Sequence, residues 1–308
     1  MTNKIAARSL LAAVRSEPSN SSSGQRRFRK RNVSIAASLF LASCEGTITT
    51  DLTVGAPADP DLQQVVAPFT GIEFETSSGA TETFAFDEAE RIDLLTFVRG
   101  APIRLLSDED LPEGTYTGVR LVFDDQTTDT AYVIDGLGAQ RDLTIEDGAF
   151  AEMDFTVEED ESSSEEITLT LDLRLSLSVD DDDQYTLRPV LRSVRTEEAG
   201  ELAGLVTASC LNDGETTNRG AMYLFQGENV TPDDFDGNGI EPYATAPIVL
   251  DGSGFNYRIE FIPEGTYTIA LACDGSEENP TTDDDLDFRA TATVDINEGE
   301  TTQQDIQI

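Results

Sequence analysis

The sequence predicts an all-β protein of two consecutive β-sandwich domains, of Ig-like or transthyretin-like type, behind an N-terminal leader. The hexapeptide PEGTYT occurs twice, at residues 112–117 and 263–268, each time between an aliphatic residue and a strand-like run. Short apolar–polar alternations separated by turn residues are typical of strands. The chain has 308 residues, enough for two domains.

Each hexapeptide is interpreted as a turn that leads into a strand. Proline fixes φ and donates no backbone hydrogen bond, and the glycine two residues later permits φ > 0. Tyr116 and Tyr267 then open the following strands and are expected to cover the edge of a core. A ligand-binding loop is the alternative interpretation.

The first half of the chain contains two predicted hairpins, at residues 71–86 and 131–145. Residues 165–179 read as one long alternating strand, and only 92–106 suits a helical turn or two. An aliphatic stripe on one face of that strand needs a covering sheet, which favours a sandwich. The stripe consists of Ile167, Leu169, Leu171, Leu173, Leu175 and Leu177.

Six further short segments after residue 200 repeat this style and predict a second sandwich. We place the junction between the two sandwiches at Thr196–Gly200. The predicted organisation is a leader and signal peptide at 1–43, a tether at 44–65, a first sandwich at 66–197 and a second at 198–308.

The first sandwich resembles a known family. Its motifs are RIDLLTFVRGAPIRLLSDEDLPEGTYTGVRLVFD, then ITLTLDLRLSLSV, then YTLRPVLRSV running into GELAGLV. Residues from about 66 to 195 thereby resemble the bacterial "domain of unknown function 4382" family of exported lipoprotein domains. That family has no assigned activity, so the resemblance implies a domain type without a mechanism. Residues 200–308 are more loosely similar to carboxypeptidase regulatory, transthyretin-like sandwiches, through a G-x-V start and the P-x-G-T-Y-T turn.

The N-terminus contains an export signal. The basic run RRFRKR (26–31) precedes a short apolar segment that ends in Leu41-Ala42-Ser43-Cys44. This ending resembles the lipobox of bacterial lipoproteins, which implies that Cys44 carries the lipid anchor. Glu45 follows where inner-membrane retention would require Asp, so we expect a cell-envelope, outer-membrane lipoprotein. An ordinary signal peptide with a chance cysteine is the alternative.

The two remaining cysteines, Cys210 and Cys273, each follow a strand-like run. An oxidising envelope permits a disulfide between them, which we expect. Two buried free thiols are the alternative.

The charge of the chain excludes some partners. From Cys44 onward there are 59 acidic residues and 12 basic ones, all arginine. A phosphate backbone is held by clustered Lys and Arg, so a nucleic-acid partner is not expected. The acidity suits either a solvated surface in salty surroundings or the binding of divalent cations.

Most of the side chains on which enzyme mechanisms depend are absent from this sequence. The chain has no His and no Trp, and no Lys follows Lys30, which removes His-based triads, common zinc sites and Schiff bases. We therefore predict a non-enzyme and no certain cofactor. A carboxylate-only hydrolase and a carbohydrate-binding accessory protein stay as alternatives. The tyrosines that would stack on sugars are Tyr132, Tyr185, Tyr223, Tyr243 and Tyr257.

One acidic loop is a candidate calcium site. Asp234, Asp236, Asn238 and Gly239 match positions 1, 3, 5 and 6 of an EF-hand loop, and Glu241 adds a further candidate ligand. Thr245 occupies position 12, where a bidentate Glu is expected, so the match covers half a site. An ordinary Asx/Gly turn is the alternative. The acidic runs at 158–166, 180–183 and 283–285 are interpreted as solvated turns.

Taken together, these features predict a lipid-anchored, non-enzymatic surface binding or scaffolding module with calcium as a candidate ion. Its partners are the membrane, through Cys44, and a protein or glycan ligand that the sequence does not identify.

Overall fold

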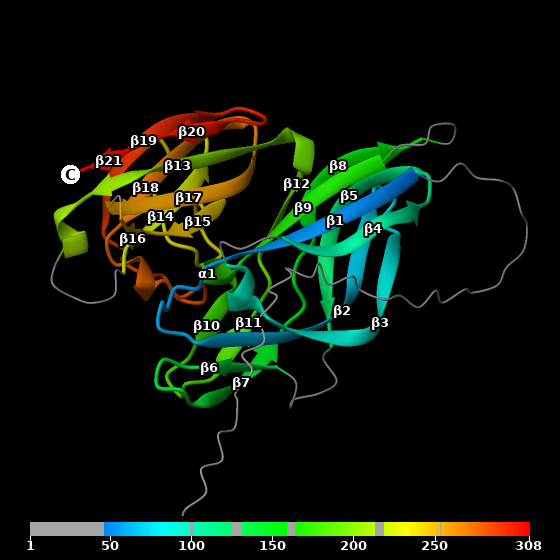
Figure 1. Ribbon diagram of the computed structural model, residues 1–308, viewed down its shortest axis with the longest axis horizontal. Coiled ribbons are helices and arrows are strands. Elements are labelled where there is room, and N and C mark those ends of the chain that lie inside the picture. Colours follow the sequence, from blue (N-terminus) through cyan, green and yellow to red (C-terminus); the bar gives the residue numbers. More distant parts are fainter. Residues whose placement is uncertain (1–45, 99–101, 125–130, 159–163, 213–218, 253) are drawn as a thin grey trace, which may run out of the picture.

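The computed structural model describes residues 46–98, 102–124, 131–158, 164–212, 219–252 and 254–308 (Figure 1). Strands dominate these residues, and each helical segment is about one turn long, which confirms the all-β class. None of the helices in this part of the chain has the length and apolar character needed to cross a bilayer.

The N-terminal domain contains two sheets around one core. The first has the strand order β12-β9-β1-β4, and the second has the order β10-β11-β7-β6-β2-β5-β8, with β3 also paired to β2. Their buried apolar side chains form a single cluster that joins the sheets. The strands of the first sheet are β1 (Gly46–Gly55), β4 (Ile103–Leu111), β9 (Ser164–Asp172) and β12 (Leu191–Arg195). The strands of the second sheet are β2 (Gln64–Thr76), β3 (Thr81–Asp93), β5 (Gly114–Phe123), β6 (Tyr132–Ile134), β7 (Gln140–Ile145), β8 (Ala151–Val157), β10 (Leu177–Val179) and β11 (Tyr185–Leu187).

Both predicted hairpins are confirmed, because β2 pairs antiparallel with β3 and β6 pairs antiparallel with β7. The helical turn expected within 92–106 is the 3₁₀ helix η1 (Leu94–Phe97), whose N-cap Asp93 accepts a hydrogen bond from the Leu95 amide.

The prediction of a tether over residues 44–65 is wrong for β1. This strand pairs parallel with β9 and antiparallel with β4, so it lies in the middle of its sheet. Ile48 and Leu52 are fully buried on its inner face. The Thr- and Gly-rich composition concealed an alternation of period two that suits a half-buried strand.

The expected long strand over 165–179 is also wrong. Strand β9 stops at Asp172, and the one-turn helix α1 (Leu173–Ser176) separates it from β10. The Asp172 carboxylate caps the turn by accepting a hydrogen bond from the Arg174 amide at 3.1 Å. All six aliphatic residues of the predicted stripe are nevertheless buried, and Leu173 of α1 belongs to the core cluster of the domain.

The C-terminal domain is a second pair of packed sheets, as expected. One has the order β16-β17-β13-β20, with β21 also paired to β13, and the other has the order β15-β14-β18-β19. A shared apolar cluster lies between them. The 3₁₀ helix η2 (Thr196–Glu198) connects the two domains. The strands are β13 (Ala199–Thr207), β14 (Ala221–Gln226), β15 (Ala244–Pro247), β16 (Val249–Asp251), β17 (Gly254–Pro263), β18 (Gly265–Ala272), β19 (Phe288–Ile296), β20 (Thr301–Gln303) and β21 (Ile306–Gln307).

The two copies of PEGTYT form the same corner in the two domains. Tyr116 in β5 donates its hydroxyl hydrogen to the Pro112 carbonyl oxygen at 2.8 Å, and Tyr267 in β18 does the same to Pro263 at 3.0 Å. Both tyrosines are buried. The repeat is therefore a structural device that fixes the entry into a strand.

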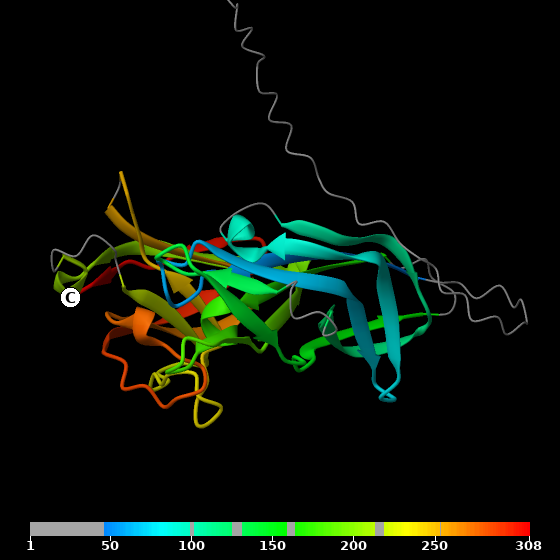
Figure 2. The ribbon, with the colours of Figure 1, turned by 90° about the horizontal axis from the view of Figure 1, so that it is seen from below.

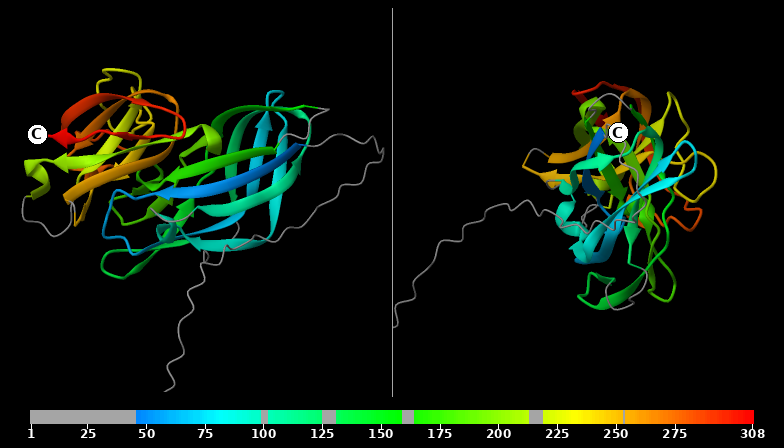
Figure 3. Two further views of the ribbon diagram at one scale, coloured as in Figure 1. Left: turned by 45° about the horizontal axis from the view of Figure 1, so that its top comes forward. Right: turned by 90° about the vertical axis from the view of Figure 1, so that its right-hand side faces the viewer.

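The two domains lie side by side along the longest axis of the molecule, with α1 where they meet (Figures 1, 2 and 3). The Asp172 carboxylate accepts hydrogen bonds from the amide and hydroxyl of Thr245 in β15, each at 2.9 Å. Arg192 donates to the Glu260 carbonyl oxygen at 2.8 Å, and Arg174 donates to the Gly275 carbonyl oxygen. The interrupted strand therefore supplies much of the polar contact between the domains.

Candidate metal centre

Two loops of the C-terminal domain cover the outer face of a sheet. In β14, Met222 and Leu224 face the core between the sheets, whereas Tyr223 and Phe225 belong to a separate apolar cluster on the opposite face. Val230 and Leu286 pack against that outer cluster, and they come from the β14–β15 loop and the β18–β19 loop, respectively. Packing on a rigid sheet therefore fixes the positions of both loops.

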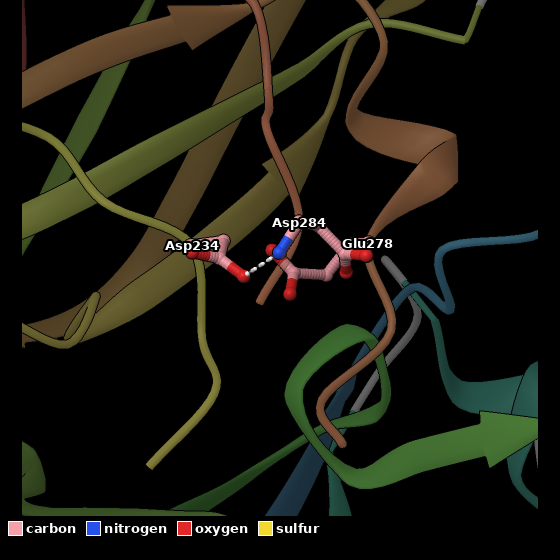
Figure 4. Close-up of side chains that lie close together, drawn as sticks. All are labelled: Asp234, Glu278 and Asp284. Carbon is pink, nitrogen blue, oxygen red and sulfur yellow. Dashed lines mark hydrogen bonds between the residues drawn. The ribbon is translucent and has the colours of Figure 1, made fainter. Parts of the chain in front are cut away.

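These loops bring three carboxylates together, from Asp234, Glu278 and Asp284 (Figure 4). One oxygen of each lies within 4.8 Å of the others. Oxygen ligands stand about 2.3–2.6 Å from Ca²⁺, so two ligands on opposite sides of one ion lie about 5 Å apart. The separation therefore allows a single ion to contact all three groups. Asp234 and Glu278 are 3% and 4% exposed, and Asp284 is half-buried.

Hydrogen bonds hold the three carboxylates in place. The Asp234 carboxylate accepts from the Asp284 amide at 2.6 Å, and the Asp284 carboxylate accepts from the Asn279 amide at 2.7 Å. Glu278 accepts from the Tyr223 hydroxyl at 3.0 Å and from the Phe235 amide at 3.3 Å. A carboxylate has about four lone-pair positions, so each group keeps capacity for a cation.

Burial disfavours charge on these groups. It raises the pKa of Glu278 to about 7, which the nearby Asp234 carboxylate reinforces, while the Tyr223 hydroxyl, the Phe235 amide and Arg174 oppose the shift. Burial also raises the pKa of Asp234. Carboxylates that ionise reluctantly when buried together are stabilised by a bound cation.

Of the four predicted ligands, Asp234 alone belongs to this cluster among the described residues. Asp236 instead accepts hydrogen bonds from the amide and side chain of Asn238, at 2.7 and 3.1 Å, as in an Asx turn. Both carboxylate oxygens of Glu241 are buried, and burial raises its pKa, which the nearby amides of Gly237 and Asn238 oppose. Binding by Asp236, Asn238 and Glu241 stays a prediction.

The sequence did not point to Glu278 or to Asp284. The sequence pattern at 283–285 predicts a solvated turn, yet Asp284 is half-buried and hydrogen-bonded on both carboxylate oxygens. Both residues lie more than 40 positions from Asp234, and only the pairing of β14 with β18 brings the loops together.

A disulfide supports the same region. Cys210 in the 3₁₀ helix η3 (Ser209–Asn212) is bonded to Cys273, which directly follows β18 and opens the loop that carries Glu278. This confirms the expected pairing. Cys44, the predicted lipid attachment site, lies outside the described residues.

The comparison with protein families identifies the N-terminal domain. Residues 45–189 match the family described as Domain of unknown function (DUF4382). The N-terminal domain belongs to this family. The DUF4382 match begins about 20 residues before the start expected from the sequence motifs, which agrees with β1 as an integral strand. Among curated proteins, no sequence matches this chain.

Several solved structures share low similarity with the chain. The Bacillus anthracis TIE protein is 12% identical with a TM-score of 0.22, over 85% of this chain and 34% of its own length. A minor pilin from Streptococcus agalactiae is 13% identical with a TM-score of 0.21, over 85% and 94% of the two chains. A fimbrial protein from Bacteroides ovatus is 10% identical with a TM-score of 0.18, over 87% and 50%. The chain thus spans about a third of the first of these proteins, and TM-scores near 0.2 transfer no function to it.

Proposed function

We propose that this chain is a non-enzymatic binding module of the cell envelope, anchored to the outer membrane through a lipid on Cys44 and stabilised by Ca²⁺ at Asp234, Glu278 and Asp284. The observation that carries the proposal is the convergence of these three carboxylates from two loops on one sheet face. The cation would fix loops that otherwise contain little regular structure.

The donor set favours a hard divalent cation. All three side chains offer oxygen, and carboxylate oxygens suit Ca²⁺, whereas zinc sites are built mainly from His and Cys. Three protein ligands fall short of the six to eight that Ca²⁺ takes, so water or backbone carbonyls would complete the shell. We therefore expect an affinity in the range of extracellular modules, with Kd about 0.1–1 mM.

The position of β1 bears on the proposed anchor. The strand begins at Gly46, two residues after Cys44. A lipid on Cys44 would therefore hold the N-terminal domain close to the bilayer, because two residues span at most about 7 Å. Acylation is tested by labelling cells with an alkyne fatty acid and fractionating membranes. We expect labelled, membrane-bound protein, soluble protein for Cys44→Ser, and an unchanged result for the control Asp181→Asn.

The alternatives fit the structure less well. Tyr223 and Tyr257 are buried, and Tyr132, Tyr185 and Tyr243 are partly covered, so these rings offer little surface for stacking on a sugar. A hydrolytic role for the acid cluster is disfavoured because glycosidase carboxylates face each other across an open cleft, about 5–10 Å apart. A protein ligand is therefore the partner we favour.

The cation is tested by calorimetric titration of the metal-stripped protein with Ca²⁺. We expect one site in the wild type, loss of binding in Asp284→Asn, and an unchanged site in Asp181→Asn, whose carboxylate lies in the exposed 180–183 turn. Equal heats in the wild type and in Asp284→Asn would overturn the assignment.

A further inference from the structure

Strand β1 runs from the end of the chain that carries the proposed anchor to the contact between the domains. It begins at Gly46 and ends at Gly55, which pairs with Asp172 of the parallel strand β9. Asp172 is the residue that accepts hydrogen bonds from Thr245 of the C-terminal domain. Because each residue of a strand adds about 3.3 Å, the two ends of β1 lie about 30 Å apart.

A further hydrogen bond between the domains lies towards the same end of β1. Arg192 of β12 donates to the Glu260 carbonyl oxygen of β17 at 2.8 Å. Its partner in β9 is Thr170, which lies beside Thr53 near the end of β1. Figures 1 and 3 show the C-terminal domain extending from this region along the longest axis of the molecule. The C-terminal domain therefore lies towards the end of β1 that is remote from Cys44.

Exposed carboxylates surround the end at which β1 begins. Asp110 in β4 and Glu166 in β9 are exposed, and they pair with Thr47 and Thr49 of β1, respectively. Glu113 in the first PEGTYT corner is exposed as well. The chain as a whole has 60 acidic residues against 20 basic ones, so negative charge is not confined to this end.

The orientation of an anchored acidic protein depends on how much of its surface comes near the lipids. Anionic headgroups repel carboxylates, and at physiological ionic strength this repulsion extends about 8–10 Å from the membrane surface. A molecule that lies flat brings the carboxylates of both domains within that range. A molecule that stands on the start of β1 brings only one end of the N-terminal domain within it, so repulsion favours the standing orientation.

We propose, on the basis of the lipid proposed for Cys44, that the protein stands on an anionic lipid surface with its longest axis directed away from the bilayer. The N-terminal domain is the base, and β1 places the contact with the C-terminal domain about 30 Å from the anchored end. The C-terminal domain is thereby the part presented to a protein ligand in solution. Electrostatic repulsion between the acidic surface and the lipids maintains this orientation.

Energy transfer from a dye on the protein to a headgroup-labelled lipid tests this proposal. Lipidated protein is purified from membranes and bound to vesicles of phosphatidylcholine and phosphatidylglycerol, with EDTA present so that the outcome is separate from that of the cation proposal. The dye is attached to Ser164→Cys, at the start of β9, or to Leu250→Cys, in β16, and both positions are exposed. Because Cys44 carries the lipid and Cys210 is bonded to Cys273, the introduced thiol is the one that reacts.

We expect about threefold more energy transfer from residue 164 than from residue 250, because β1 separates the anchored end from the domain contact by about 30 Å. In about 1 M NaCl, where screening shortens the repulsion to about 3 Å, the ratio should fall towards one. Equal transfer from both positions at physiological salt, in protein that floats with the vesicles, would overturn the orientation and leave the anchor intact. So would a ratio unchanged in 1 M NaCl, because repulsion would then not maintain the orientation. Protein that does not float would overturn the anchor, and this inference with it.

Discussion

The two PEGTYT corners are alike in their local structure and differ in their surroundings. Each tyrosine hydroxyl returns to the proline carbonyl four residues earlier. Tyr116 then stacks on Phe155, with ring centroids 5.1 Å apart, inside the core of its own domain. The ring centroid of Tyr267 lies 5.9 Å from that of Tyr243. Tyr267 also lies within electrostatic range of Arg192, which belongs to the other domain.

This difference separates what a short motif determines from what the tertiary context adds. The hexapeptide builds one corner wherever a strand follows it, since its contacts are local. Whether the corner acts within one domain or at a boundary between two depends on residues far away in sequence. The N-terminal corner is therefore expected to report on its own domain, and the C-terminal corner on the contact between domains as well.

The largest expected effect is removal of either tyrosine ring. Tyr116→Ala and Tyr267→Ala each delete a buried aromatic side chain, which lowers the free energy of unfolding by about 3–5 kcal/mol. Urea unfolding followed by circular dichroism measures the loss. We expect Tyr116→Ala to destabilise the N-terminal domain alone, and Tyr267→Ala also to weaken the domain contact. If each variant destabilised both domains equally, the two corners would not differ in the way described.

Removal of the disulfide is expected to destabilise the C-terminal domain and not the N-terminal domain. The double variant Cys210→Ser/Cys273→Ser opens a link that spans 63 residues, and the chain-entropy model gives a loss of about 4 kcal/mol for a loop of that order. The effect is expected in the C-terminal transition of a calorimetric scan. An equal shift of the N-terminal transition would contradict it.

Glu278 should make stability depend on pH in the C-terminal domain. Its folded pKa of about 7 lies above the ordinary value of 4.5, so the folded state holds a proton that the unfolded state has released. In metal-free protein, stability therefore falls as pH rises from about 4.5 through 7, by on the order of 3 kcal/mol.

Melting of the EDTA-treated protein across this pH range measures the effect. The groups that face Glu278 are Tyr223, Arg174, Asp234 and Asp284. Glu278→Gln should flatten the pH dependence, because a neutral amide replaces the titrating group. A slope that persists unchanged in Glu278→Gln would assign the effect to another group.

Loss of the cap on α1 should uncouple the domains. Asp172→Ala leaves the amide and hydroxyl of Thr245 without their buried acceptor, at a cost of about 2 kcal/mol. We expect two separated calorimetric transitions where the wild type shows strongly overlapping ones. Thr245→Val serves as the matched test from the other side of the contact, and a single unchanged transition in both variants would show that α1 does not join the domains.

The smallest expected effect compares the hydrogen bonds of the two corners most directly. Tyr116→Phe and Tyr267→Phe keep the ring and remove one hydrogen bond each, so each should cost about 1 kcal/mol in chemical denaturation. Similar losses in both variants would support a shared local corner. A loss in one variant alone would mean that the two hydrogen bonds are not equivalent.

Local patterns revealed most of the fold. Hairpins, the repeated corner and the second sandwich follow from alternation and turn residues close together in sequence. The interruption at Asp172 could not be foreseen, because the same leucine pattern suits a strand, and the bond to Thr245 comes from another domain. Strand β1 was missed because threonines at its alternating positions resemble a polar linker.

The candidate site was predictable only in part for the same reason. Asp234 was singled out by its spacing to Asp236 and Asn238, whereas its neighbours in space, Glu278 and Asp284, lie in another loop. Acidic runs are abundant in this chain, so composition gives no sign of which carboxylates are buried. The pairing of β14 with β18 and the apolar outer face of their sheet decide that.

The most direct test of the account is differential scanning calorimetry with about 1 mM Ca²⁺, with EDTA, and with NaCl at matched ionic strength. At tenfold excess over Kd, bound Ca²⁺ adds about 1.4 kcal/mol to the folded state. We expect a Ca²⁺-specific rise of the C-terminal transition that is lost in Asp284→Asn and kept in Asp181→Asn. An equal rise with NaCl, or a Ca²⁺-specific rise that survives in Asp284→Asn, would contradict the assigned site.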